Sequence, residues 1–331
     1  MKLSDRFKPL LPALFAAALL VTAPWQAFAD NDLTTFQDVK KGMDNAADTF
    51  ATTLPFYSTL GLNTPDAYIG QFTRVPPNIT VGASAGAAFI PVSELEEFLD
   101  KLRVDVPSEL DTFLGLPLPA AVLDARFGGF VYPFDFGVKV GYLPELDVAG
   151  TDVSFDYLLV GADIRTPLFR GRGPLPTISA GAGVNYVRGH LGFPIDDVTV
   201  EYEDGGTQEV TFDDAEFQAD WSATVFDLKL QASSNLLILT PYAGLGASYA
   251  LAETEFTLDS ETAEDFADAA REAGLKVDDT SVSSKSDETG WSVRAFGGTS
   301  INMALLRLDL GLLYNFVGRN LGAAIGARIQ L

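Results

Sequence analysis

The sequence predicts an all-β fold: a closed, transmembrane, antiparallel up-and-down β-barrel of about ten strands, preceded by a helix and coil. About ten segments of roughly ten residues alternate between apolar and polar side chains, as tilted strands that cross a bilayer do. Hydrophobic residues make up 47% of a chain whose net charge is −23, so apolar and charged residues must be segregated. After the first thirty residues there is no apolar run of about 18 residues, which excludes a helical span. A closed barrel is the remaining way to satisfy the backbone in lipid.

The last two segments show the alternation most clearly. In 306–316 every even position is large and apolar, whereas Arg307, Asp309 and Asn315 lie between them. In 321–331 the odd positions are apolar and the even positions include Gly322, Gly326 and Arg328. Because side chains alternate across a strand, each segment has one apolar face and one largely polar face. We expect the apolar face to meet lipid and the polar face to line the lumen.

Eight further segments carry the same pattern. The sixth of them changes phase near Val225, which predicts a β-bulge there. The eight are 79–89, 121–130, 134–142, 157–166, 177–188, 221–232, 239–251 and 291–303.

The links between the strands alternate in length, which is typical of barrels with short turns on one side of the membrane and long loops on the other. The short links are 132–133, 170–174, 233–235 and 302–304, and the long ones are 90–118, 143–152, 195–218 and 252–290. Seven aromatic residues fall at the long-loop end, where an interfacial girdle is expected. They are Phe89, Tyr142, Tyr186, Trp221, Tyr249, Trp291 and Phe316.

The N-terminus predicts export. Lys2, Arg6 and Lys8 precede an apolar run at 10–21, and Ala27-Phe28-Ala29 fits a cleavage site before Asp30. These features indicate a cleaved signal peptide over 1–29. We therefore expect three parts: the signal peptide at 1–29, a helix and coil at 30–77, and the barrel at 78–331.

Residues 30–77 predict an amphipathic helix followed by a coil. Apolar residues from Phe36 to Leu54 have helical spacing, and Thr34 or Thr35 can cap the helix. Prolines and asparagines then interrupt the chain up to 77. Two positions remain open at this stage: a plug folded into the lumen, or a cap beneath the periplasmic mouth.

With these features the chain resembles bacterial outer-membrane β-barrel proteins over residues 79–331. The resemblance rests on the signal peptide, the alternating strands, the aromatic end and the apolar last residue, Leu331, where such barrels usually end in Phe or Trp. It implies a place in a Gram-negative cell envelope, contact with outer-membrane lipid, and insertion by the barrel-assembly machinery. The helix and coil are similar to the plug of fatty-acid transport barrels, which have more strands.

Charged residues of both signs lie on the predicted inward face. They form either a ladder of ion pairs that fills a narrow lumen or a charged conduction path. Inward glycines leave space for side chains of 30–77, for water or for a ligand. The charged set is Asp124, Arg126, Asp135, Lys139, Asp163, Arg165, Asp227, Lys229, Arg294, Arg307, Asp309 and Arg328.

The excess negative charge lies in the long loops and argues against a nucleic-acid partner. The acidic residues near Asp196 and Asp204 lack the pattern of a calcium loop, and we expect them to form a solvated surface. The chain has no cysteine and a single histidine, so we expect no cofactor and no metal.

Enzymatic activity is not expected. Outer-membrane proteases with ten strands use His and Asp at the outer end, and His190 lies near that end with Asp196 and Asp197 close in sequence. No nucleotide-binding or nucleophile motif accompanies them.

The predicted function is a porin-like, narrow or plugged channel for passive transport of small or amphipathic solutes. The alternatives are a non-conducting surface barrel whose acidic loops mediate binding, adhesion or membrane integrity, and, third, an outer-membrane hydrolase. The sequence leaves open whether the lumen conducts, which solute passes, whether 30–77 plugs the barrel, what the loops contact, and the oligomeric state.

Overall fold

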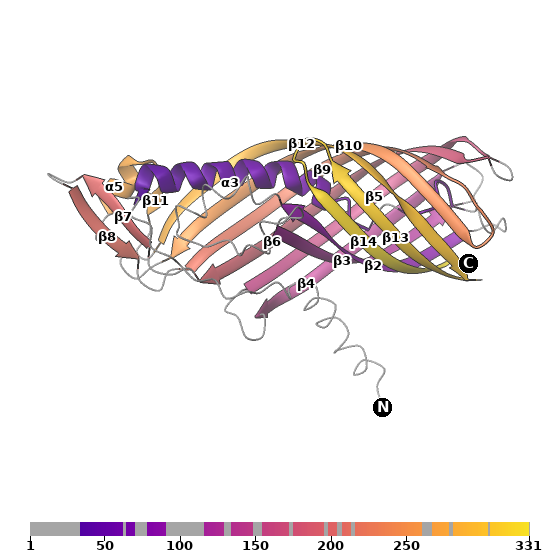
Figure 1. Cartoon of the computed structure of the whole chain (residues 1–331), viewed down its shortest axis with the longest axis horizontal. Helices are drawn as coiled ribbons and strands as arrows, with labels where there is room; N and C mark the ends of the chain where they lie inside the picture. Colours follow the sequence, from indigo (N-terminus) through magenta and orange to yellow (C-terminus); the bar gives the residue numbers. More distant parts are fainter. Residues whose placement is uncertain are drawn as a thin grey trace, which may run out of the picture.

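Ten long strands close into an antiparallel barrel, as predicted (Figure 1). The computed structural model describes residues 34–61, 64–69, 78–90, 116–128, 134–147, 154–171, 175–194, 198–203, 207–212, 216–259, 267–277, 281–303 and 305–330. The barrel strands are β2 (Asn78–Ile90), β3 (Leu116–Gly128), β4 (Asp135–Asp147), β5 (Ser154–Phe169), β6 (Thr177–Pro194), β9 (Glu216–Ser233), β10 (Leu239–Asp259), β12 (Ser281–Met303), β13 (Leu306–Asn315) and β14 (Leu321–Gln330).

Each barrel strand pairs with the next one along the chain, including β10 with β12, and the pairing of β14 with β2 closes the ring. Short elements stand at the long-loop end: β1 (Thr34–Thr35) pairs with β7 (Val198–Glu203), which pairs with β8 (Thr207–Phe212). There too lie α5 (Ala267–Glu272) and β11 (Lys276–Val277) (Figure 1). Among the described residues no helix is long and apolar enough to cross a membrane.

The outer surface of the barrel carries the apolar band that the alternation predicts. Large side chains such as Leu123, Leu228, Leu245 and Leu312 are exposed on it. In water these side chains would lose the favourable transfer free energy of burial, so the surface is suited to hydrocarbon.

β9 corrects two sequence predictions. Its burial alternates without interruption from Glu216 to Ser233, and its registers with β6 and β10 contain no shift, so the predicted bulge near Val225 is absent. Trp221 faces inward and is buried, not part of the outer girdle, whereas Tyr142, Trp291 and Phe316 are exposed as expected. The sequence changes phase because the lumen beside Trp221 is apolar, while the lumen further along β9 is charged. Register irregularities occur instead in β4–β5 and β5–β6.

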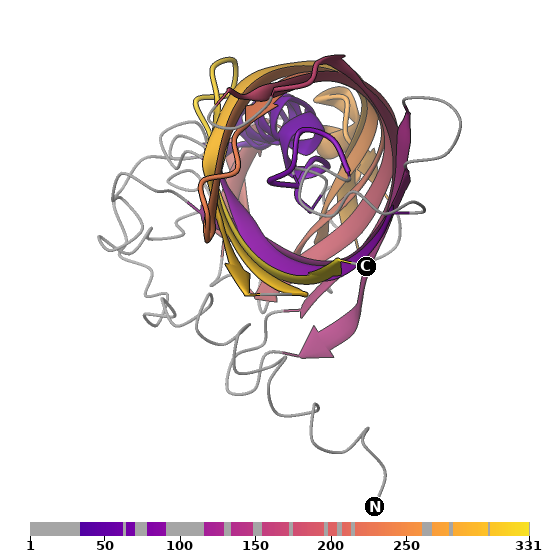
Figure 2. The same ribbon diagram turned by 90° about the vertical axis from the view of Figure 1, so that its right-hand side faces the viewer.

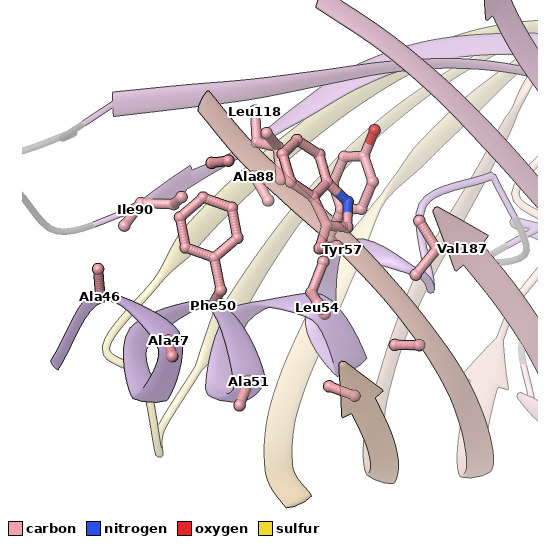
Figure 3. Packing of buried hydrophobic residues seen from close by; sticks show 14 of the residues in the cluster. Ala46, Ala47, Phe50, Ala51, Leu54, Tyr57, Ala88, Ile90, Leu118 and Val187 are labelled. Atoms are coloured by element: carbon pink, nitrogen blue, oxygen red, sulfur yellow. The ribbon is translucent and has the colours of Figure 1, made fainter. Parts of the chain in front are cut away.

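A 22-residue helix, α3 (Phe36–Tyr57), lies inside the barrel, along the inner side of β10 and β12 (Figure 2). Thr35 and Asp38 form a capping box at its start. Its apolar residues pack into a buried cluster with inward side chains of the wall, and Figure 3 shows Phe50 pointing from α3 into the cluster that holds Ala88, Ile90 and Leu118. The predicted signal peptide at 1–29, and 62–63 and 70–77 of the coil, lie outside the described residues.

The wall is taller on one side than on the other, and α3 lies against the tall side. β10 and β12 contain 21 and 23 residues, whereas β13 and β14 contain ten each. β12 pairs with β13 only as far as Arg294, and α3 lies beside β12 beyond that point. A Cβ on Gly290 of β12 would lie 1.7 Å from the carbonyl oxygen of Ala51, so this close approach requires glycine.

Candidate functional site: the lumen and its N-terminal segment

All twelve predicted lumen charges are buried, and they lie in one zone of the barrel interior. We call the part of the lumen lined by these residues the charged zone, and the part lined by the buried apolar cluster the apolar zone. In the charged zone Arg126 pairs with Asp135 and, at 2.5 Å, with Asp163. Arg165 lies 2.8 Å from Asp135, and Lys229 lies 3.0 Å from Asp163. These five side chains form one network, which offsets the cost of burying each charge.

Two further groups complete the charged zone. The Arg294 guanidinium donates to both carboxylate oxygens of Asp227, at 2.7 and 3.1 Å. Arg328 pairs with Asp309 and, at 3.3 Å, with Asp124. The ladder of ion pairs is therefore the arrangement that these residues adopt.

Several inward glycines make room for these arginines. Gly246 lies directly opposite Arg294, and a Cβ there would lie 2.6 Å from the guanidinium carbon. Gly137 is opposite Arg126, where a Cβ would lie 2.5 Å from a guanidinium nitrogen. A strand with no side chain at the pairing position lets the neighbouring arginine lie flat across it.

The predicted wall charges comprise five acids and seven bases, and the N-terminal segment supplies partners for the excess. Asp66 pairs with Arg307. The Lys139 ammonium donates to the carbonyl oxygen of Ser58 and, at 2.8 Å, to that of Leu60, at the C-terminal end of α3. A cation at this end of a helix also interacts favourably with the helix dipole.

The same segment is held by hydrogen bonds along its whole described length. Arg165 donates to the Thr64 hydroxyl at 2.9 Å and to the Asp66 carbonyl at 2.7 Å. Gln231 donates to the Thr64 carbonyl at 2.6 Å, and the Ile69 amide donates to Asp135 at 2.8 Å. Sequence reasoning missed Asp66 and these carbonyl groups. The excess of two basic residues on the wall is the signal in the sequence that could have revealed them.

The apolar zone packs against the apolar face of α3. The Phe50 ring lies 5.3 Å from Trp221 and 5.7 Å from Phe256, and Phe155 lies 6.4 Å from Trp221, all between ring centroids. The Phe56 ring lies against Gly322, where a Cβ would be 3.0 Å from it. Aromatic packing of this kind stabilises beyond the area that it buries.

Tyr57 ends α3 within the apolar zone. Its hydroxyl donates to the carbonyl oxygen of Pro119 at 2.7 Å. Burial, together with the nearby Tyr157, holds the pKa of Tyr57 well above its ordinary value, so the phenol stays protonated and remains a donor.

His190 lies apart from the lumen, on the outer face of the tall wall. Its Nδ1 is 2.9 Å from a carboxylate oxygen of Asp220, and its Nε2 is 3.4 Å from the Ser154 hydroxyl. It borders an open surface hollow of about 320 Å³ with Asp156, Glu255 and Lys285. Asp196 and Asp197 lie outside the described residues. Over the part of the chain that is described, no three His, Cys, Asp or Glu side chains form a group that suits a metal.

No family model and no curated protein matches the chain. Solved structures of similar fold include the Escherichia coli outer membrane protease OmpT, at 10% identity over 77% of this chain and 97% of that one, with a TM-score of 0.42. A major outer membrane protein from Thermus thermophilus matches at 11% identity over 76% and 99%, with a TM-score of 0.32. The CymD monoaromatic hydrocarbon channel matches at 10% identity over 91% and 98%, with a TM-score of 0.26. Similarity at this level carries no information about activity or ligand.

The class of the protein follows from the fold itself: it is a barrel of the bacterial outer-membrane type. Its closed ring of strands, its apolar outer band and its buried polar lumen define that class.

Proposed function

We propose that this protein is a plugged channel that passes small amphipathic solutes passively across the outer membrane. The observation that carries the proposal is the lumen's two zones, both occupied by one segment of the chain's own N-terminus. Polar contacts such as Asp66 with Arg307 and Lys139 with Ser58 hold that segment, and no disulfide ties it to the wall because the chain has no cysteine. The segment is therefore a removable occupant.

The chemistry of the solute follows from the chemistry of the plug. Displacement of the segment leaves an apolar surface around Phe155 and Trp221 and a charged surface around Arg165 and Arg307. A molecule with a hydrocarbon part and a polar part can satisfy both surfaces, whereas a wholly polar solute leaves the apolar zone without partners.

Planar-bilayer conductance tests the proposal. The full chain is expected to be almost silent, and a chain lacking residues 30–77 is expected to conduct. Because the deletion can impair folding, a second variant keeps the full length and loosens the plug by Asp66→Asn together with Gln231→Ala, which should produce transient openings. The matched control is Asp48→Asn, on the exposed face of α3. Silence of both variants, in preparations shown to be folded, contradicts the channel.

A specific observation favours the second candidate, a non-conducting surface barrel that binds a partner. A row of charged and polar side chains crosses the outside of the tall wall above the apolar band: Asp156, His190, Asp220, Glu255 and Lys285 are register partners in successive strands. Under this alternative, exchange of Asp220 and Glu255 for Asn and Gln abolishes attachment to a partner surface and leaves conductance at zero in every variant.

The proposal also includes the absence of enzymatic activity. Support comes from His190, which is oriented outward and contacts Asp220 beside an open surface, so the described residues form no enclosed site around it. A peptide-cleavage assay on the purified barrel is expected to give the same background rate for the natural chain and for His190→Ala. Cleavage that disappears in His190→Ala contradicts this part of the proposal.

A further inference from the structure

The barrel ladder is interrupted between β3 and β4. The two strands pair from Gly128 with Asp135 as far as Leu123 with Val140. Beyond that pair both continue as strands, β3 to Leu116 and β4 to Asp147, and each stays paired with its other neighbour. Residues 116–122 and 141–147, all of them described, form no ladder with each other. We call this place the β3–β4 break.

Prolines in β3 account for the break. Pro117 and Pro119 alternate with Ala121, whose amide and carbonyl are directed across the break. Proline has no amide hydrogen, so these positions cannot donate to a neighbouring strand. Pro144 lies in the corresponding part of β4. Natural sheets confine proline to edges, and here the edges lie within a barrel wall.

Two tyrosine hydroxyls replace the missing ladder. The Tyr157 hydroxyl accepts from the Ala121 amide at 2.5 Å and donates to the Ala121 carbonyl at 2.6 Å. Its ring passes Gly141 of β4, where a Cβ would lie 3.0 Å from it. Tyr57 of α3 donates to the Pro119 carbonyl at 2.7 Å. Buried backbone groups require partners, and these partners are side chains, which can rotate away without unfolding a strand.

Apolar surface lies on both sides of the break. On the inner side Leu118, Ala120 and Leu143 are buried in the cluster around α3. On the outer side a groove of about 890 Å³ begins at Pro119 and crosses β2, β14 and β13 to β12. Almost all of its lining side chains are apolar, and small ones such as Ala85, Ala87 and Ala323 form its floor. Neither the described lining of the groove nor these inner side chains include a residue of the charged zone.

We infer that the β3–β4 break is a lateral portal through which a hydrocarbon chain from the membrane enters the apolar zone. The inference rests on the proposed function and specifies the route of the solute's apolar part. Hydrocarbon is the occupant because the groove faces lipid and offers almost no polar group. Tyr157 and Tyr57 close the portal at rest, and movement of the N-terminal segment withdraws Tyr57.

The chain has no cysteine, so a single introduced thiol reports its own accessibility. Ala120→Cys places the thiol on the inner side of the break. Ala223→Cys is the matched control: it is equally apolar, inward and buried, but it lies in β9 between fully paired neighbours. The probe is an N-alkyl maleimide with a long alkyl chain, dissolved in the lipid of proteoliposomes that contain the full-length protein.

Ala120→Cys is expected to react at least about tenfold faster than Ala223→Cys, because a paired wall opens only by sub-global unfolding. Adding Tyr157→Phe should raise the Ala120→Cys rate by about tenfold, since two hydrogen bonds are lost, and should leave Ala223→Cys unchanged. Equal rates for the two thiols, or no effect of Tyr157→Phe, overturn the portal. Labelling of the full-length protein does not depend on conductance. Fast labelling together with silence of both plug variants refutes the channel and keeps the portal, whereas slow labelling together with conductance of those variants refutes only the portal.

Discussion

The charged zone and the apolar zone of the lumen hold the same N-terminal segment by different means. In the charged zone the wall grips short coil stretches through directed contacts, such as Arg165 with the Thr64 hydroxyl and Asp66 carbonyl. In the apolar zone it holds a helix mainly by packing around Phe50 and Leu54, with few hydrogen bonds such as that of Tyr57 to Pro119. Directed contacts fix the position of a chain, whereas packing tolerates sliding. The coil therefore sets the register of the plug, and α3 fills the volume.

The largest expected effect comes from breaking one ion pair in the charged zone. Arg294→Ala leaves the Asp227 carboxylate buried without its bidentate partner, and it should lower the free energy of unfolding by about 4 kcal/mol. Urea unfolding in lipid vesicles measures the change. Arg294→Met combined with Asp227→Leu removes both charges and should restore most of the loss. Equal destabilisation in the single and double variants contradicts the pairing.

The corresponding change in the apolar zone is Phe50→Ala. It removes a ring that packs against Trp221 and Phe256, and it should cost about 3 kcal/mol from lost burial and the cavity left behind. The same urea titration detects it. Phe50→Leu retains most of the volume and should cost much less, so similar losses for Ala and Leu would show that packing is not what holds α3.

Asp66→Asn tests whether the coil after α3, and not α3 itself, fixes the position of the plug. The variant weakens the pair with Arg307 and should cost about 1–2 kcal/mol, less than either change above, because the amide still accepts a hydrogen bond. Limited proteolysis should cut the coil after Tyr57 sooner and leave the barrel strands intact. An unchanged cleavage rate would mean that the coil is held mainly by its other contacts.

The smallest effect concerns Asp48, on the exposed face of α3. Burial, Glu288 and Asp44 raise its pKa above 3.8, so the charged form is disfavoured in the folded protein. This destabilisation is present at pH 7 and disappears as the pH falls through the raised pKa to the ordinary range of Asp. Asp48→Asn should therefore melt slightly higher than the natural chain at pH 7, and the difference should close towards pH 4. A difference in melting temperature that widens as the pH falls would contradict a raised pKa for Asp48.

Alternation was enough to predict the ten strands and the burial of all twelve lumen charges, because a period of two is imposed wherever a wall separates lipid from a polar interior. It was not enough at Trp221, where the inner face is apolar and the outer face carries polar side chains such as Asp220 and Ser222, so the polar positions of β9 lie outside here and inside further along the strand. The bulge predicted near Val225 was wrong for that reason. The position of α3 could not be predicted either, since an amphipathic helix packs equally well inside a mouth or beneath it.

The most direct test of the central claim, that α3 lies inside the barrel against the tall wall, is a disulfide between Asp44→Cys and Ser284→Cys. The Ser284 hydroxyl donates to the Asp44 carboxylate at 3.2 Å, so the side chains at these two positions face each other, as a crosslinked pair requires. Lys285→Cys, the next residue on β12, points to the opposite face and serves as the control. We expect rapid crosslinking of the first pair in intact membranes and none between Asp44→Cys and Lys285→Cys. Equal crosslinking of both pairs, or of neither, would contradict it.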